Sequence, residues 1–251
     1  MKIFRNRHDN PRIFFMHIPK SGGTSVDYAM RKNYQNSFRR IEASASYKAS
    51  EIVNSHMHWE ENYNACFRYR EGLLVYEMVR GVRYISGHIL YDQKIWYLFK
   101  DKYNYISLLR HPVERYVSNY FYNRYKDSEH CRLETSISSF LESDLGRSWG
   151  HEFIKFFSGS QTKSDDLPEV KLNVAKENAL KFNTIGFLDS LESFVAECKS
   201  KYGLKLNIPH KRKNPKGNYG LSKAEFDRIA HVCRFDIELY DFIRSSSCKV
   251  Y

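Results

Sequence analysis

The sequence predicts an α/β fold in which helices flank a central, mainly parallel sheet. Two apolar runs of strand length, 12–18 and 105–109, are each followed at once by a segment with helical periodicity. Strands and helices that alternate in this way form parallel sheets with helices on their faces. The chain has 251 residues, 42% of them hydrophobic, which is enough for one sizeable core. We therefore expect a single domain over 1–251, with its core at about 12–243.

The first strand-to-helix junction begins with the run 12–18, which lies between two prolines and is typical of a buried strand. A loop containing Gly22 and Gly23 follows. Thr24 or Ser25 is the expected N-cap of a helix that continues to about residue 34.

The other elements follow from the same patterns. The segment 36–80 has no clear periodicity and stays unassigned. Strands are expected at 82–86, 105–109 and 184–187. Helices are expected after Asp92, over 112–125, 134–141 and 150–157, after a capping box at 189–192, and from a second capping box at 222–225 to about 243.

The glycine loop has the composition of an anion cradle. Backbone N–H groups of such a loop converge on an anion, and the start of the next helix adds positive potential. The lysine precedes the glycines, which is not the order found in nucleoside triphosphatases. A simple turn with a solvated lysine is the alternative that the loop alone leaves open. The candidate anion-binding residues are Lys20, Ser21, Gly22, Gly23, Thr24 and Ser25.

The second junction supplies two more candidates. Arg110 ends the apolar run 105–109, and Ser118 lies about two turns into the following helix. Both side chains can reach one further anionic group. Taken alone, Arg110 is equally compatible with a capping or ion-pair role.

Three blocks together resemble the signature blocks of sulfotransferases related to the heparan sulfate and uronyl 2-O-sulfotransferases (sulfotransferase family 2). The blocks are 18–25, 86–88 and 109–120, and their order and approximate spacing are similar as well. A weaker likeness continues through 156–159 and 185–187. The resemblance covers most of the chain, and it implies a P-loop-like three-layer fold.

The resemblance also implies a donor, 3′-phosphoadenosine 5′-phosphosulfate (PAPS). The first block would bind its 5′-phosphosulfate, and Arg110 and Ser118 its 3′-phosphate. A late basic loop of the family is similar to the segment with Lys211, Arg212 and Lys213, which would close over the nucleotide. The alternative for that segment is a solvated basic turn.

His88 occupies the position at which the related 2-O-sulfotransferases carry a catalytic histidine, which implies that it is the general base. A histidine suits this role because its unperturbed pKa is about 6.5. Lys20 would stabilise charge on the bridging and leaving-group oxygens. Without the resemblance, a structural histidine at a strand end would be favoured. The sequence departs from the family at His111, where an aspartate is common, and at Ser21, where threonine is frequent.

Composition narrows the remaining possibilities. The formal charge of +11 points to an anionic partner but does not choose among nucleotide, acidic polysaccharide, nucleic acid and membrane surface. The five scattered cysteines indicate reduced thiols, and the lack of a signal-like or membrane-spanning apolar stretch predicts a soluble cytoplasmic protein. No metal is expected, because His56, His58 and Cys66 match no strong ligand pattern.

These observations predict an enzyme that transfers a sulfuryl group in line from PAPS to an acceptor hydroxyl, with a carbohydrate or polysaccharide as the favoured acceptor. A tyrosyl-protein sulfotransferase is the alternative within the same chemistry. A non-catalytic nucleotide or nucleic-acid binding protein is the alternative of another class. No RNA-binding aromatic motif or zinc finger supports a nucleic-acid partner. Acceptor identity and oligomeric state stay open.

Overall fold

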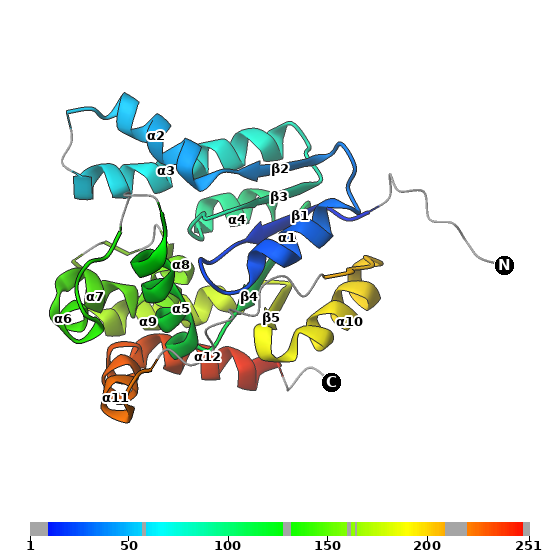
Figure 1. Ribbon diagram of the computed structural model, residues 1–251. Helices are drawn as coiled ribbons and strands as arrows, with labels where there is room; N and C mark the ends of the chain where they lie inside the picture. The colour runs from blue at the N-terminus through cyan, green and yellow to red at the C-terminus, as the bar shows by residue number, and fades with distance from the viewer. Residues whose placement is uncertain are drawn as a thin grey trace.

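The computed structural model describes residues 10–56, 59–127, 132–159, 162–163, 165–208 and 220–247. Its centre is a sheet with the strand order β2-β3-β1-β4-β5, in which every pair of neighbours is parallel (Figure 1). The predicted α/β class is therefore confirmed. The strands are β1 (Ile13–Met16), β2 (Phe38–Ile41), β3 (Tyr84–Gly87), β4 (Asn104–Leu109) and β5 (Thr184–Phe187).

Helices cover both faces of this sheet. Successive residues of β1 point to opposite faces, so Ile13 and Phe15 join one core while Phe14 and Met16 join the other. On the first face, α1 (Gly23–Arg31) and α10 (Leu191–Tyr202) pack over the sheet. Buried side chains on the second face come from α3 (Trp59–Val79), α4 (Gln93–Phe99), α8 (Glu152–Ser158), α9 (Pro168–Ala179) and α12 (Arg234–Ser247).

A third core lies beside the sheet, among helices that follow β4 (Figure 1). Tyr116 and Tyr120 are buried there, whereas Tyr125, at the end of the same helix, is exposed. Its helices are α5 (Pro112–Tyr125), α6 (Ile137–Glu142), α7 (Asp144–Trp149) and α11 (Lys223–Val232). The remaining elements are α2 (Ala43–Val53), which packs against α3, and the short 3-10 turn η3 (Leu188–Ser190).

Three predicted boundaries are wrong. The first helix starts at Gly23 with Gly22 as its N-cap, and neither Thr24 nor Ser25 caps it. The capping box at 189–192 does not form, because Asp189 instead binds the guanidinium of Arg244 at 2.7 and 3.0 Å.

The C-terminal helix is also divided in two. The capping box at 222–225 forms as predicted, but the helix that it opens ends at Val232, and α12 begins at Arg234. The unassigned segment 36–80 contains β2, α2 and α3, and α9 is an element that the sequence patterns did not indicate.

The parallel register brings the strand ends together. Met16 of β1 lies beside Gly87 of β3 on one side and beside Ser107 of β4 on the other. The segments that leave these strands therefore emerge at one edge of the sheet, the edge at which ligands bind in parallel α/β folds.

Three further findings bear on the composition. Cys66, Cys198 and Cys233 are buried free thiols. Within the described ranges, no helix combines the length and apolar character needed to cross a membrane. Over the same ranges no group of three or more metal-ligating side chains gathers, and His58 lies outside them.

Candidate functional site

The loop between β1 and α1 is held in a conformation that requires its glycines. Gly22 has a φ of +83°, and a Cβ atom on it would stand 2.7 Å from Cδ1 of Leu188. A Cβ on Gly23 would stand 2.3 Å from Cδ2 of His17. The loop therefore packs too closely for a side chain at either position. Lys20 also has a positive φ, of 65°.

The start of α1 offers unsatisfied hydrogen-bond donors. No side chain caps the helix N-terminus. Ser21 is completely buried, and its Oγ has no hydrogen-bond partner among the described residues. A buried hydroxyl without a partner lowers the stability of the fold by about 1–3 kcal/mol, so this position favours a ligand oxygen that accepts a hydrogen bond from Ser21. The combination fits an oxyanion such as phosphate or sulfate.

Lys20 links the first junction to the second. Its Nζ lies 3.7 Å from the centre of the Tyr122 ring, which belongs to α5. Tyr122 is a residue that the sequence did not single out, since its position on a helix gives no sign of a contact with the glycine loop. Thr24 is exposed and Ser25 is half-buried.

Two histidines lie against this cradle. The rings of His17 and His88 are 4.6 Å apart, and the His17 ring packs on Gly23. Nδ1 of His88 lies 2.5 Å from the carbonyl oxygen of His17. Because a carbonyl only accepts, Nδ1 of His88 carries the proton and the lone pair of the neutral ring is on Nε2.

Burial keeps both histidines neutral. Burial is the main cause that lowers the pKa of His88, and the cation of Arg70 lowers it further, against the hydrogen bond to His17. Burial and then His88 lower the pKa of His17 well below its ordinary value. Arg40 of β2 acts in the same direction on both rings. His88 therefore has the tautomer and the charge that a base requires near neutrality.

Arg70, from the segment that sequence patterns left unassigned, supports the His88 backbone. It donates from Nη1 to the His88 carbonyl at 3.1 Å, from Nε to Ser46 Oγ at 2.8 Å, and from Nη2 to the Ala43 carbonyl at 3.0 Å. These bonds join α3 and α2 to the end of β3. No sequence signal marks Arg70, because its role arises only when distant elements meet.

Asp27 fixes the helix that begins at the cradle. Its Oδ1 accepts from Ser86 Oγ at 2.6 Å and from the Tyr84 hydroxyl at 2.9 Å, and its Oδ2 pairs with Arg31 at 3.2 Å. The two hydrogen bonds and the ion pair all reach a fully buried carboxylate. Ser86, which belongs to the same block 86–88 as His88, thus holds α1 against β3.

The second junction is charged and more open. Nε of Arg110 pairs with Glu114 at 3.1 Å, and the exposed fractions of the two side chains are 28% and 62%. Ser118 is half-buried and lies one turn beyond Glu114 on α5. His111 does not cap α5 with its side chain but packs on the Tyr240 ring, with the ring centres 5.7 Å apart.

The structure therefore brings Lys20, the glycine loop and His88 to one edge of the sheet, and the start of α5 reaches the same edge. Lys211, Arg212 and Lys213 lie outside the described residues.

Comparison with known proteins adds the following findings. The model of a family described as "Sulfotransferase family" matches residues 3–246. No curated protein matches the chain. Among solved structures, mouse sulfotransferase SULT7A1 complexed with PAP aligns with a TM-score of 0.42 and 14% sequence identity. The alignment covers 93% of this chain and 66% of the mouse chain.

Proposed function

The chain belongs to the sulfotransferase family, and we propose that it transfers a sulfuryl group from PAPS to a carbohydrate hydroxyl, with His88 as the base. The observation that carries the proposal is the hydrogen bond from Nδ1 of His88 to the His17 carbonyl. It directs the lone pair to Nε2 of a neutral ring that lies beside an anion cradle.

The donor half of the site rests on the first junction. Ser21, the N–H groups at the start of α1 and Lys20 would hold the 5′-phosphosulfate, and the orphaned Ser21 hydroxyl supports this assignment. Gly22 and Gly23 would permit the close approach of the donor, while Thr24 and Ser25 would add hydroxyl donors. Arg110 and Ser118 would hold the 3′-phosphate, with Lys211, Arg212 and Lys213 as the closing loop.

The proposed reaction is an in-line displacement at sulfur. The acceptor oxygen forms a bond to sulfur while the bond from sulfur to the bridging phosphate oxygen breaks, and that oxygen leaves with the electron pair. Nε2 of His88 takes the proton of the acceptor hydroxyl. Lys20 stabilises the negative charge on the leaving oxygen, and positioning of the two substrates supplies much of the acceleration.

The excess of positive charge over the chain supports an acidic carbohydrate as the acceptor. Arg70 supplies part of this charge beside His88, to whose carbonyl it donates, and the charges of Arg70 and Arg40 both lower the pKa of His88. A tyrosine side chain is the acceptor to be tested against it.

Donor binding is tested first, by thermal unfolding with adenosine 3′,5′-bisphosphate. At a hundredfold excess over Kd the ligand should stabilise the wild type by about 2.7 kcal/mol, which raises Tm by several degrees. Lys20→Ala and Arg110→Ala should reduce the shift. Lys199→Ala, at an exposed lysine near the end of α10, is the matched control and should keep it. No shift of the wild type at millimolar ligand contradicts the donor assignment.

Transfer is tested with radiolabelled donor against acidic glycans and tyrosine peptides. His88→Asn keeps an N–H that can donate to the His17 carbonyl but lacks the base, so turnover should fall roughly 100-fold or more while the nucleotide shift remains. His231→Ala, at an exposed histidine of α11, should retain turnover. Normal turnover by His88→Asn contradicts the base, and label found only in tyrosine peptides contradicts the carbohydrate acceptor.

A further inference from the structure

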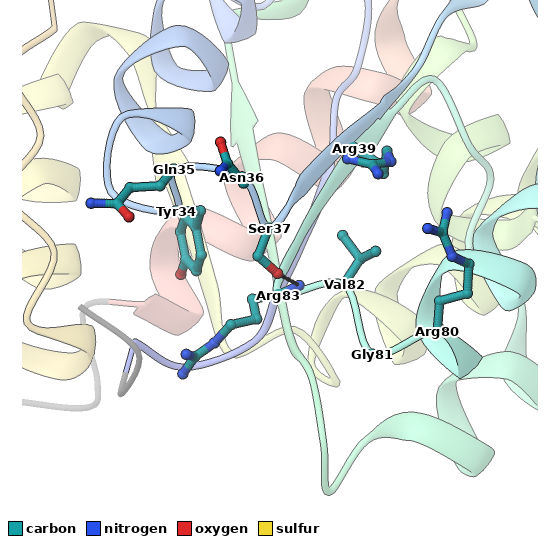
Figure 2. A pocket seen from close by; sticks show the side chains of 9 residues that line it. All are labelled: Tyr34, Gln35, Asn36, Ser37, Arg39, Arg80, Gly81, Val82 and Arg83. Atoms are coloured by element: carbon teal, nitrogen blue, oxygen red, sulfur yellow. Dashed lines mark hydrogen bonds between the residues drawn. The ribbon is translucent and has the colours of Figure 1, made fainter. Parts of the chain in front are cut away.

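A cavity of about 370 Å³ lies at the opposite edge of the sheet, where β2 and β3 begin (Figure 2). One wall is the segment 34–37 between α1 and β2, and the other is the turn 80–83 between α3 and β3. The two walls are joined by bonds from the Arg83 N–H to Ser37 Oγ and from the Tyr84 N–H to the Ser37 carbonyl, both 3.1 Å. The cradle and His88 take no part in this cavity.

The cavity is lined by arginines. Figure 2 shows Arg39 and Arg80 on the Val82 side of Ser37, and Arg83 on the side of Tyr34. Arg39 donates to the Phe38 carbonyl at 2.7 Å and Arg80 pairs with Glu77 at 3.1 Å, bonds that use only part of the five N–H donors of each guanidinium. None of the described residues that line the cavity is acidic. The lining therefore favours an oxyanion.

The other lining groups favour a ligand with hydroxyl groups over a nucleotide base. Gln35 and Asn36 are exposed amides that both donate and accept. Tyr34 has no free face for a base, because its ring is buried and stacks on Tyr84 with the centres 5.3 Å apart. Its hydroxyl donates to the Pro11 carbonyl at 2.8 Å.

Backbone geometry supports a binding role for this edge. Gln35 has a φ of 47°, and Lys20 of the anion cradle is the other non-glycine residue with a positive φ among the described residues. Such strain concentrates at binding sites. Gly81, which also lines the cavity, has a φ of +75°, and a Cβ atom built on it would meet only Arg12, at 3.5 Å.

Strand β2 connects this cavity to the proposed catalytic edge. It begins at Phe38 beside the cavity and ends at Ile41, opposite Gly87 and next to His88. Three residue steps in a strand span about 10 Å. Arg39 borders the cavity, while Arg40, the next residue, is close enough to His88 to lower its pKa. Because Arg39 and Arg40 are successive residues of a strand, their side chains point to opposite faces, but the length of β2 is one that a single anionic chain can span.

We propose that this cavity is a second oxyanion site, which binds a sulfate or carboxylate group of an anionic carbohydrate chain. Arg39 and Arg80 hold the anion, and the amides of Gln35 and Asn36 bind neighbouring hydroxyls. That the bound chain is also the acceptor rests on the proposed function. The existence of the second oxyanion site does not depend on the proposed function, because this cavity lies apart from the donor cradle.

The test is calorimetric binding of a sulfated hexasaccharide, with its unsulfated counterpart and inorganic sulfate as further probes. Arg39→Gln/Arg80→Gln should raise Kd for the sulfated hexasaccharide roughly tenfold or more, because two charge-assisted contacts are lost. Arg147→Gln/Arg228→Gln removes two partly exposed arginines elsewhere and should change Kd less than about twofold. Thermal midpoints of both variants verify that they fold.

Saturating adenosine 3′,5′-bisphosphate should leave hexasaccharide binding intact, and the nucleotide should bind the Arg39→Gln/Arg80→Gln variant as it binds the wild type. Competition by inorganic sulfate that depends on these arginines supports the oxyanion site. Four results would each overturn it. The two double variants could lose the same affinity for the sulfated hexasaccharide, or the unsulfated sugar could bind equally well. The sulfated hexasaccharide could also fail to bind the wild type, or the nucleotide could displace it. Failure of the proposed function is recognised separately, by the absence of a nucleotide shift in the wild type.

Discussion

The two strand-to-helix junctions of the site have the same local topology but differ in chemistry. Apart from Lys20, the junction from β1 to α1 is built largely from buried, neutral groups, with His17 packed on Gly23 and an unpartnered Ser21 hydroxyl within the described residues. The junction from β4 to α5 is built from partly exposed charges, with Arg110 paired to Glu114. The same local topology therefore gives two candidate anion sites of different chemistry.

This difference predicts how each junction fails. A tightly packed neutral junction is sensitive to added volume and to protonation, because neither can be relieved by solvent. A partly exposed ion pair contributes little to stability and responds mainly to salt and to the removal of one charge.

The largest effect is expected from Gly23→Ala. Its Cβ would stand 2.3 Å from His17 Cδ2, and overpacking of this kind costs about 1–3 kcal/mol or more. Tm should fall by roughly 5 °C, as measured by calorimetry, and the shift caused by adenosine 3′,5′-bisphosphate should be lost. Gly72→Ala is the matched control, since nothing lies within 4 Å of its added Cβ and the α3 helix should gain stability. Equal Tm values for the two variants would show that the first junction is not tightly packed.

The second-largest effect is expected from protonation of the buried histidines, which should lower the stability of the first junction. The pKa values of His17 and His88 are lowered in the folded chain, so below pH 6.5 the unfolded chain binds more protons and stability falls as pH decreases. Above pH 7 this contribution should be constant. Urea unfolding from pH 5 to 8, compared with His88→Asn, measures the contribution of His88 together with its effect on the pKa of His17. A single histidine changes the stability by at most about 1.4 kcal/mol per pH unit.

The comparison with the variant is needed because Asp236 acts in the opposite direction. Burial raises its pKa to about 7, so it stabilises the folded chain in acid and loses that contribution as pH rises through 7. Asp236 is the same in wild type and His88→Asn, and its effect cancels in the difference. A difference between the two proteins that does not change with pH would contradict a neutral buried His88.

Sequence patterns predicted the parts of this site that depend on local chemistry. The apolar run 12–18 and the glycines after it define β1 and the cradle, and the proline after Arg110 defines the start of α5. Parallel register then places His88 at the same edge, a consequence of topology that the alternation of elements already implied.

Sequence patterns could not predict which residues orient His88. His17 lies within an apolar run, where a histidine reads as a core residue, and only its contact with Gly23 reveals its position. Arg70 comes from α3, whose sequence shows no clear apolar face, and its partners lie 18 to 27 positions away in the chain. At Asp189 a local pattern gave a wrong prediction. The residue was expected to cap a helix, but it binds Arg244, which is distant in the sequence.

A smaller effect is expected at the second junction from Glu114→Gln. The carboxylate competes with an anionic ligand for Arg110, so its removal should tighten binding of adenosine 3′,5′-bisphosphate, by up to about fivefold, the value of a partly exposed ion pair. The gain should shrink as salt is raised. Asp144→Asn, which breaks the exposed pair with Arg147, is the control and should leave Kd unchanged. Weaker binding by Glu114→Gln would show instead that Glu114 positions Arg110.

The smallest effect is expected where the two junctions touch, at Tyr122. Its ring lies 3.7 Å from Nζ of Lys20, and such a contact at an exposed site contributes about 0.5–1 kcal/mol. If the ring holds Lys20 toward α5 for the donor, Tyr122→Leu should weaken nucleotide binding roughly twofold, while Tyr122→Phe, which keeps the ring, should not. Titration of the nucleotide against the three proteins measures this difference. Tighter binding by Tyr122→Leu would mean that the ring restrains Lys20 away from the donor, and the first junction would then work independently of the second.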